Sequence, residues 1–377
     1  MSAVDNVLVV GAGLAGTATA IHLASSGVAV DLVEIKPEVT ALGSGITLQG
    51  NALRELRALG VLDECIAEGW TSEGLVLRAP FAPDATVIAR MPNVRSGGPD
   101  LPASMGMYRP DLARILMGRA EQAGVKTRFS STIQELEQDG VGVDVRFTDG
   151  STRRYDLVVA ADGVRSWTRR MLQIPLETRS VGMGIWRVFA PRPAEVENSE
   201  FYYGGPCYIA GYTPTGTNSV YAVLVEDAQD RTTVSPQEKV AIVRQLSEAY
   251  HGPWDEIRES ITDPEKIHYT WFEEHLLDAP WHRGRVVLIG DAVHTCPPTL
   301  AQGGALALED ASVLAELLTS ADRLDDDLLS RFAARRHDRV KTVVDASLQL
   351  ARWQLAHEQG DVPALMGRIA ALTSQPA

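Results

Sequence analysis

Residues 6–16 read N-V-L-V-V-G-A-G-L-A-G, a short apolar run that passes directly into three glycines spaced as G-x-G-x-x-G. A helix-forming segment follows, Gly27 ends it, and a second apolar run over residues 28–33 leads to Glu34. A strand, a glycine turn, a helix, a strand and an acidic residue about 20 positions later form the βαβ unit of dinucleotide sites. The stretch therefore predicts an α/β fold built on a Rossmann-type parallel sheet.

Each glycine of this turn has its own physical role. Gly11 permits the tight turn, Gly13 lets the backbone approach a pyrophosphate, and Gly16 lets the helix pack closely on the strand. Glu34 is placed to accept hydrogen bonds from ribose hydroxyls. Because a carboxylate disfavours a 2′-phosphate, NADP is not expected at this site, and FAD and NAD both remain open.

A strand, a carboxylate and a helix also stand in line over residues 285–311, which read R-V-V-L-I-G-D-A-V-H-T-C-P-P-T-L-A-Q-G-G-A-L-A-L-E-D-A. Asp291 follows the apolar run in a polar turn, and Gly303 and Gly304 open an Ala/Leu-rich helix. A helix start with bare backbone N–H groups attracts negative charge, and a carboxylate at a strand's end can hold a hydroxyl. An ordinary βα unit with a long loop is the alternative interpretation.

Three shorter stretches add candidate ligand contacts. Residues 160–166, A-A-D-G-V-R-S, place Asp162 and Gly163 after a buried strand, where ligands bind in open α/β sheets. Residues 42–47, L-G-S-G-I-T, are expected to form either a loop beside a ligand's ring or a plain connection. Arg109 stands just before a helix that has a proline at its first position. An arginine in that place is solvated unless a phosphate lies within its reach.

Two further helices are predicted. Asn51 is a typical N-cap residue, so a helix is expected from Ala52 to Leu59. Residues 331–358 have apolar side chains at helical spacing and carry several arginines, which predicts a structural helix packed on the first domain.

The composition changes near Pro175 and changes back near residue 285. Residues 180–273 contain aromatic and β-branched runs, which predict a separate antiparallel sheet with helices on one face. We therefore expect a discontinuous nucleotide-binding domain, an inserted substrate-binding domain and a C-terminal helix, with a pocket in the cleft between the domains. The expected bounds are 1–174 with 281–377 for the first domain and 175–280 for the second.

The bulk composition excludes several classes of protein. The 377 residues are 45% hydrophobic and carry a formal net charge of −14, which argues against a nucleic-acid partner and an anionic membrane surface. Cys65, Cys207 and Cys296 have neither disulfide nor zinc spacing, so no metal site is predicted. No leader and no apolar run of membrane-spanning length stand out, so the expected location is a reducing cytoplasm.

Three motifs, G-A-G-L-A-G with Glu34, A-A-D-G-V-R-S, and L-I-G-D-A-V-H-T-C-P-P-T-L-A-Q-G-G-A, occur in this order across nearly the whole chain. The combination resembles the single-component FAD-dependent aromatic hydroxylases, the family that includes para-hydroxybenzoate hydroxylase. It is most similar to the branch of salicylate hydroxylase and 6-hydroxynicotinate 3-monooxygenase. The resemblance implies bound FAD, with NADH or NADPH as a transient electron donor because a second G-x-G-x-x-G does not occur.

The resemblance also implies a role in FAD binding for each motif. Glu34 would bind ribose, Arg109 would reach the pyrophosphate or ribityl side, and Asp291 would hold the ribityl chain. Asp162 and Gly163 match a motif shared between FAD and the nicotinamide cofactor. The residues expected to contact the cofactor are Gly11, Gly13, Leu14, Ala15, Gly16, Glu34, Ile35, Ser44, Thr47, Arg109, Ile133, Asp162, Gly163, Asp291, Gly303, Gly304 and Ala305.

The implied reaction is hydroxylation of a small aromatic or heteroaromatic substrate with O₂ through a flavin C4a-hydroperoxide. Pro298 stands where the family has a proline beside the reacting face of the flavin. Thr47 stands where the hydroxynicotinate branch has a histidine, so a base is missing there, although Thr47 can still hydrogen-bond. Tyr212 falls near a substrate-binding tyrosine of that branch. Trp186 and Arg187 are candidates to meet an aromatic acid, although Arg187 is expected at the surface or between the domains. The expected catalytic residues are Tyr212, Thr47 and Pro298.

Other functions stay open from sequence alone. They are a tailoring monooxygenase for a larger natural product, an NAD-dependent dehydrogenase, and a flavin-binding protein without turnover. The dehydrogenase leaves Asp291 and the glycine pair at 303–304 unexplained. The sequence does not decide the substrate, the choice of NADH or NADPH, or whether the chain is a monomer or a homodimer.

Overall fold

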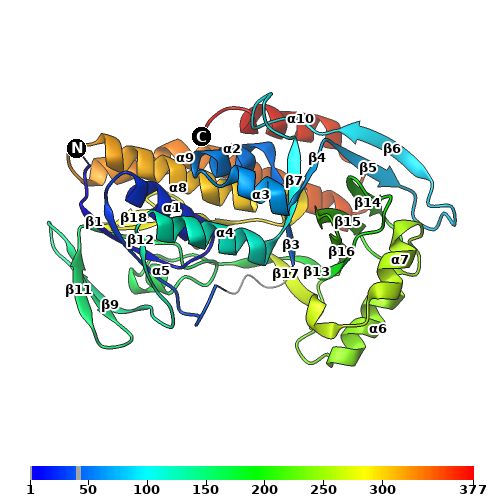
Figure 1. Ribbon diagram of the computed structural model, residues 1–377, viewed down its shortest axis with the longest axis horizontal. Helices are drawn as coiled ribbons and strands as arrows, with labels where there is room; N and C mark the ends of the chain where they lie inside the picture. The colour runs from blue at the N-terminus through cyan, green and yellow to red at the C-terminus, as the bar shows by residue number, and fades with distance from the viewer. Residues whose placement is uncertain (1, 40–43) are drawn as a thin grey trace.

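A six-stranded sheet drawn from separate parts of the chain forms the left-hand part of the computed structural model, which describes residues 2–39 and 44–377 (Figure 1). Strands β1, β2, β8, β12 and β19 run parallel, which confirms the predicted Rossmann-type sheet. The central strands are short apolar runs that are buried on both faces, as parallel strands covered by helices should be. In spatial order the strands are β18 (His282–Arg283), β19 (Val286–Leu288), β12 (Leu157–Ala160), β1 (Asn6–Val10), β2 (Ala29–Val33) and β8 (Lys126–Arg128).

Helices bury this sheet and join it to the rest of the molecule. Helix α1 (Leu14–Ser25) packs on β1 and β2 and also contacts α4 (Arg109–Gln122) and α8 (Gly303–Ser320). Helix α9 (Asp326–Leu355) packs on α8 and reaches strands of the second large sheet. The predicted C-terminal helix therefore begins five residues earlier than expected, and a further helix, α10 (Val362–Thr373), packs on it.

The second large sheet has eight strands and is antiparallel except between β5 and β14. Helices α6 (Pro236–Ser247) and α7 (Pro253–Ser260) cover one face, and the C-terminal end of α9 packs on the other. Ser235 and Glu238 form a capping box at the start of α6. In spatial order the strands are β20 (His294–Thr295), β17 (Ile267–Leu276), β13 (Arg179–Pro191), β16 (Ser219–Asp227), β15 (Ile209–Gly216), β14 (Ser199–Tyr203), β5 (Gly74–Arg78) and β6 (Val87–Pro92).

Two of these eight strands come from the part of the chain before residue 175. Strand β5 pairs with β14 in parallel, and β6 pairs with β5. Sheet membership therefore does not follow the expected bounds of 1–174 with 281–377 and 175–280, and that division remains a prediction. No strand is predicted over these residues because G-L-V-L-R and V-I-A-R-M-P are short runs without clear alternation.

A small sheet connects the two large ones. It consists of β3 (Gly45–Gln49), β7 (Ser104–Tyr108) and β4 (Trp70–Ser72), and β7 contacts β15 of the eight-stranded sheet. The expectation of a loop over residues 42–47 is therefore wrong from Gly45 onward, and residues 42 and 43 lie outside the described residues. The remaining elements are α2 (Gly50–Ala58), α3 (Leu62–Glu68), α5 (Trp167–Met171) and a sheet of β9 (Ile133–Gln138), β10 (Val143–Phe147) and β11 (Thr152–Tyr155).

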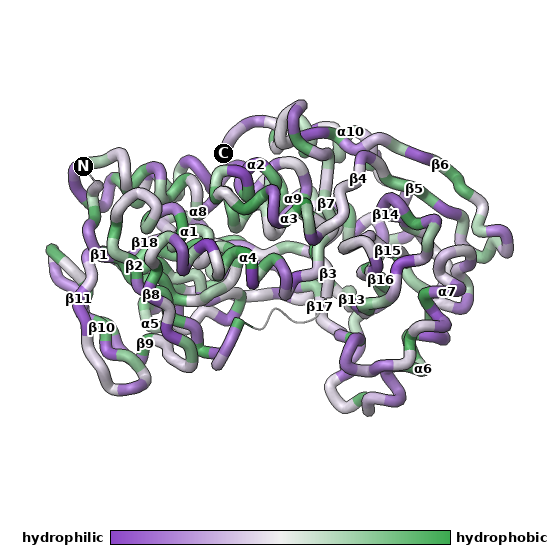
Figure 2. The backbone as a smooth tube through the Cα atoms, viewed as in Figure 1, coloured by the Kyte–Doolittle hydropathy of each residue, from purple (hydrophilic) through white to green (hydrophobic). Residues whose placement is uncertain are grey.

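Hydrophobic residues gather around the strands labelled β2 and β8 in Figure 2. Within the described ranges, no helix has both the length and the apolar character that crossing a membrane requires. Nor do the described residues contain a cluster of three or more His, Cys, Asp and Glu side chains suited to a metal ion.

Candidate functional site

The first turn of α1 is shaped by three glycines. Gly11 has φ +101°, and a Cβ there would lie 2.5 Å from the carbonyl oxygen of Ala161. A Cβ on Gly16 would lie 1.9 Å from the carbonyl oxygen of Gly11, so neither position has room for a side chain. Gly13, the N-cap residue, has no heavy atom within 4 Å of an ideal Cβ. The uncapped N–H groups around Leu14 and Ala15 thus begin a helix beside open space, where a pyrophosphate can bind.

Glu34 follows β2 and stands beside this turn. Its Oε2 accepts a hydrogen bond from the Ala12 N–H at 2.9 Å, and its Oε1 accepts one from the Lys36 N–H at 3.0 Å. The carboxylate is therefore fixed next to the glycine turn. Of the other expected contacts here, Ile35 is 67% exposed, whereas the side chain of Ile133 is buried, so Ile133 can offer a ligand only its backbone.

The Asp162 carboxylate is used within its own loop. Its Oδ1 accepts a hydrogen bond from Ser166 Oγ at 2.5 Å, and its Oδ2 accepts from the N–H and Oγ1 of Thr168, both at 2.9 Å. Asp162 thus holds the start of α5, while Gly163 (φ +78°) has open space beside its Cα. Because the Asp162 carboxylate is used within the loop, a ligand here would be contacted by the backbone at Gly163 rather than by that carboxylate.

Asp291 and Arg109 carry opposite charges that lie close enough to influence each other. Solvent reaches both side chains, yet burial is the largest cause that raises the pKa of Asp291 and lowers the pKa of Arg109. Side chains that many protein atoms surround and solvent still reaches are typical of a concave surface, which is called the hollow below. Arg109 Nε donates to the Gly45 carbonyl at 3.1 Å, and this hydrogen bond holds one side of the guanidinium group in place. Neither charged head group has an ion-pair partner among the described residues within 4.0 Å.

The turn that carries Asp291 is anchored by a buried carboxylate. Asp310 Oδ2 accepts from the Gly290 N–H at 2.9 Å and lies 2.8 Å from His294 Nε2, while Oδ1 accepts from Arg336 Nε at 2.8 Å. Burial alone would raise the pKa of Asp310, but His294 and Arg336 outweigh it and hold that pKa at about 2. His294 is therefore a structural histidine.

The start of α8 converges on the same region. Its N-cap, Gln302, makes no side-chain cap, and the first turn has no acidic residue. A Cβ on Gly303 would meet nothing within 4 Å, whereas one on Gly304 would lie 3.3 Å from Leu14 Cδ1 and 3.2 Å from Ile46 Cδ1. The starts of α1 and α8 and strand β3 therefore meet, and bare N–H groups at α8 are available to a negatively charged group.

Four other expected contacts lie around these helix starts. Ser44 is buried just before β3, and Thr47 lies in β3 opposite Gly106. Ala305 is buried in the first turns of α8, and Pro298 is exposed in the short helix η3 (Pro298–Leu300). The catalytic roles of Thr47 and Pro298 stay predictions.

Tyr212 lies on the wrong face of its sheet to meet a ligand in this hollow. The side chain is fully buried in the core beneath α7, where its ring packs edge-on to Trp254. Its hydroxyl donates to Glu200 Oε2 at 2.7 Å, and burial strongly raises its pKa. A substrate could reach this phenol only if the core opened. The structure therefore contradicts the assignment of Tyr212 as a catalytic or substrate-binding residue.

Arg187 and Tyr221 are absent from the expected catalytic residues, but both act electrostatically on Arg109. The positive charge of Arg187 lowers the pKa of Arg109, whereas Tyr221 and Asp291 raise it, which brings these groups close together. Tyr221 also packs against Gly45, where a Cβ would lie 2.3 Å from the Tyr221 Cβ. The signal that could have found Arg187 is a lone cation in an otherwise apolar strand, G-M-G-I-W-R-V-F-A.

A parallel Rossmann-type sheet, two uncapped helix starts and an accessible carboxylate without an ion-pair partner in the described residues are the features of a protein that binds a dinucleotide carrying a polyol. Comparison with known proteins agrees. The family described as FAD binding domain matches residues 5–347. The chain is 32% identical over 358 residues to 2-heptyl-3-hydroxy-4(1H)-quinolone synthase of Pseudomonas aeruginosa, a match that covers 92% of this chain and 90% of that protein.

Two solved structures have the same fold over almost their whole length. The tetrameric form of 2-methyl-3-hydroxypyridine-5-carboxylic acid oxygenase superimposes with a TM-score of 0.81 at 25% identity and covers 97% of this chain and 95% of its own. Klebsiella pneumoniae HpxO, solved with FAD and uric acid, gives a TM-score of 0.83 at 22% identity, with 98% and 93% covered.

The chain belongs to the FAD-binding-domain family and is an FAD-dependent monooxygenase. The residues present fit FAD, since Gly13 and Gly303 leave open space at two helix starts and Asp291 has an accessible carboxylate without an ion-pair partner in the described residues. The family decides against the alternative of an NAD-dependent dehydrogenase. NADH or NADPH is the electron donor typical of this family.

Proposed function

We propose that this protein hydroxylates the ring of a small aromatic or heteroaromatic compound bound in the hollow between Asp291, Arg109 and the eight-stranded sheet. The observation that carries the proposal is the grouping of four polar side chains, since the charges of Arg187, Tyr221 and Asp291 all act on Arg109 while solvent still reaches Arg109 and Asp291. When bound, FAD supplies the electron transfer and oxygen chemistry that no amino-acid side chain can provide. The protein binds FAD, orients the substrate and keeps water out.

The cofactor would be held by the chain's own groups at three places. The N–H groups at the start of α1 would hold the pyrophosphate beside Gly13, and Glu34 would accept hydrogen bonds from ribose. Asp291 would accept hydrogen bonds from the ribityl hydroxyls. The start of α8 would stabilise negative charge on the ring system, since bare N–H groups and the helix dipole favour an anion. These assignments remain proposals for the individual residues.

The substrate wall of the hollow has one polar end. Across the sheet, Arg187 stands opposite Val223, Val223 opposite Gly211, and Gly211 opposite Phe201. Opposite residues in paired strands share a face, so Arg187 and its other neighbour, His268 of β17, form the polar end of a row that is otherwise apolar. Val223 and Phe201 belong to the hydrophobic cluster that also includes Leu355 of α9. A ring with a hydroxyl, oxo or carboxylate group toward Arg187 and an apolar remainder along this row would suit the wall.

Alkyl-substituted quinolones are the second substrate class to test. The relative with 32% identity is named as a synthase of a heptyl-hydroxyquinolone, and an apolar row accepts an alkyl chain by excluding water from it. This possibility corresponds to the alternative of a tailoring enzyme for a larger natural product.

The test is oxidation of NADH or NADPH by the FAD-loaded protein with a panel of hydroxypyridines, hydroxybenzoates and alkylquinolones. A true substrate should accelerate reduction of the flavin and yield a product heavier by one oxygen atom, detected by mass spectrometry. If every compound of the panel gave only hydrogen peroxide, the proposed function would be wrong.

Replacement of Arg187 sharpens that test. Arg187→Met should raise KM for an oxygen-bearing ring about tenfold to hundredfold, because a hydrogen bond to a charged group contributes roughly 1.5–3 kcal/mol. FAD affinity should stay unchanged. Arg179→Met, on the same strand but with a 67% exposed side chain, is the matched control and should leave KM unchanged.

The proposed location is a reducing cytoplasm, and the proposed oligomeric state is a monomer or a dimer. Cys65, Cys207 and Cys296 are all free, which suits a reducing compartment. The hydroxypyridine carboxylate oxygenase is described in a tetrameric form, so size-exclusion chromatography with light scattering should decide between monomer, dimer and tetramer here.

A further inference from the structure

The side chain of Gln302, at the start of α8, is held by a second amide. Gln302 Oε1 accepts from Asn51 Nδ2 at 3.0 Å, and Gln302 Nε2 donates to Asn51 Oδ1 at 3.3 Å. Both side chains are buried, with 4% and 0% exposure. Asn51 is the second residue of α2, whose N-cap is Gln49, so the expectation that Asn51 caps this helix is wrong. Its amide instead fixes the residue that precedes the flavin-facing helix.

Asn51 is itself held by a buried ion cluster. Its Nδ2 also donates to Glu309 Oε1 at 2.9 Å. Glu309 is a fully buried residue of α8. It accepts hydrogen bonds from Arg339 Nε and Nη2 at 2.8 and 2.7 Å and lies 3.0 Å from Arg336 Nη1. Burial alone would raise the pKa of Glu309, but the two arginines outweigh it and lower that pKa. Glu309 is therefore an ionised acceptor that keeps the Asn51 amide in one orientation.

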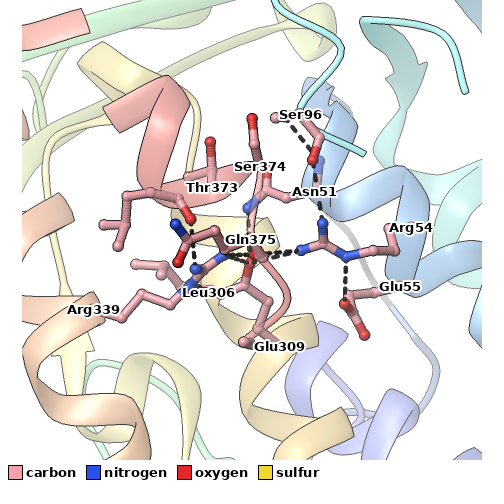
Figure 3. Close-up of polar contacts among 12 residues, drawn as sticks. Asn51, Arg54, Glu55, Ser96, Leu306, Glu309, Arg339, Thr373, Ser374 and Gln375 are labelled. Atoms are coloured by element: carbon pink, nitrogen blue, oxygen red, sulfur yellow. Dashed lines mark hydrogen bonds and ion pairs between the residues drawn. The ribbon is translucent and has the colours of Figure 1, made fainter. Parts of the chain in front are cut away.

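The cluster continues to the C-terminal helix α10. Arg339 Nη1 donates to the Leu372 carbonyl at 2.8 Å, and Arg339 Nη2 donates to the Gln375 carbonyl at 3.1 Å. Arg54 Nη2 donates to the same Gln375 carbonyl at 3.2 Å. Figure 3 shows Arg54 and Arg339 meeting at this carbonyl from opposite sides, with Asn51 and Glu309 between them. Two cations thus satisfy carbonyls that the end of a helix leaves unpaired.

We propose that Asn51 is a positioning residue for the first turn of α8, and that α10 keeps Asn51 in place through Arg339 and Glu309. Asn51 acts on the start of α8 only through Gln302, the N-cap residue. Buried charge clusters are weak contributors to net stability but can fix one arrangement of a structure. The arrangement fixed here is the direction in which the uncapped N–H groups of α8 point.

The proposal rests on the proposed function in one respect, that α8 faces the flavin ring. When the first turn of α8 is held in one position, its N–H groups stabilise reduced FAD, which is negatively charged, more than they stabilise oxidised FAD. Loosening the turn should then weaken the binding of reduced FAD selectively. The reduction potential of bound FAD reports this difference directly, and it can be measured without any aromatic substrate.

The experiment compares Asn51→Leu, Gln302→Met and the double variant in the FAD-loaded protein. Each single change should weaken reduced FAD about tenfold relative to oxidised FAD, a potential lower by about 30 mV for a two-electron couple. The double variant should be no lower than either single one, because both changes remove the same link. Potentials are measured by equilibration with redox dyes, and FAD dissociation constants by fluorescence.

Thr373→Val is the matched control. Thr373 is buried in α10 beside the cluster, but its Oγ1 donates only within its own helix, to the Ile369 carbonyl at 2.9 Å and the Ala370 carbonyl at 3.4 Å. This near-isosteric change should lower the unfolding temperature without moving the potential. If Asn51→Leu does not fold, Asn51→Ser takes its place under the same criteria.

An unchanged potential in a folded, FAD-loaded Asn51 variant would overturn the positioning role, and so would fully additive shifts in the double variant. Neither result touches the proposed hydroxylation, which fails separately if the unaltered protein transfers no oxygen to any ring. The two outcomes are therefore distinguishable.

Discussion

The starts of α1 and α8 both offer unpaired backbone N–H groups to a ligand, but different parts of the chain hold them in place. Both are uncapped helix N-termini that meet at Leu14 and Gly304. At α1, glycines close together in sequence create the geometry, because a side chain on Gly16 would overlap Gly11 and one on Gly11 would overlap the end of β12 at Ala161. At α8, the geometry depends on side chains of α2 and α9 and on backbone carbonyls at the end of α10, joined through Asn51 and Glu309. One binding end is thus encoded locally and the other by tertiary contacts.

This difference should appear in how each end fails. A locally encoded turn fails by steric overlap of a single atom, and the rest of the molecule feels little of it. A turn held by a buried charge cluster fails when one charge loses its partner, because the remaining ions cannot regain water. The α8 end should therefore be the more sensitive to a single isosteric substitution.

The largest expected effect is that of Glu309→Gln. The side chain keeps its shape but leaves Arg339 facing a neutral amide in a fully buried cluster. Removing one partner of a buried ion pair costs roughly 3–5 kcal/mol. The free energy of unfolding, measured by urea denaturation of the FAD-free protein, should fall by about this amount.

Glu316→Gln is the control for this prediction. Glu316 lies on the same helix and pairs with Arg335 at 2.8 Å, but its side chain is 56% exposed. Exposed ion pairs contribute about 0–1 kcal/mol. Equal losses in the two variants would contradict the view that a buried cluster fixes the start of α8.

The next effect concerns two glycines of the α1 turn. Replacing one by alanine should lower stability, and replacing the other should lower FAD affinity. Gly16→Ala places a Cβ 1.9 Å from a backbone oxygen that cannot move freely, so the free energy of unfolding should fall by about 1–3 kcal/mol. Gly13→Ala places its Cβ in open space, so stability should change by less than about 0.5 kcal/mol. FAD affinity of the Gly13 variant should nevertheless fall about tenfold, by fluorescence titration, because the methyl group occupies the approach of the pyrophosphate.

An unstable Gly13 variant with normal FAD affinity would contradict that assignment, because it would show that the open space at Gly13 serves the fold and not the ligand. A stable Gly16 variant would show instead that the turn is able to relax.

The same contrast explains what the sequence could predict. The parallel sheet, the α1 turn, Glu34 and the Asp291 turn were predictable because each is a short pattern with one physical meaning. The link from Asn51 to Gln302 spans about 250 residues and has no local signature, so it could only be seen in the fold. Asn51 looked like a helix cap because side-chain amides serve both purposes.

Tyr212 and Arg187 show a second limit. The face of a strand residue follows from register, and a one-residue difference reverses it. In most antiparallel sheets a polar face reveals the register, but here α6 and α7 cover one face and α9 the other, so both faces are apolar. The sequence could therefore place Tyr212 in the correct sheet but not on the correct side, and it left Arg187 undecided between the surface and the domain cleft for the same reason.

The smallest expected effect is a gain in stability when Asp291 loses its charge. Burial raises the pKa of Asp291 in the folded, FAD-free protein above its usual value near 3.8. The folded state then binds this proton more tightly than the unfolded state, so stability falls as pH rises from about 3.8 through the raised pKa and stays lower above it. Asp291→Asn removes this penalty, and the FAD-free variant should unfold roughly 1–3 °C higher at neutral pH.

This gain should vanish below about pH 3.8, where the carboxyl is protonated in both states. FAD affinity should move the other way and fall about tenfold, since an amide is a weaker acceptor for ribityl hydroxyls than a carboxylate. Asp338→Asn, at a side chain that is 98% exposed, should change neither quantity. A less stable Asp291 variant with unchanged FAD affinity would mean that this carboxylate supports the fold, and that the α8 end of the site has no polyol contact there.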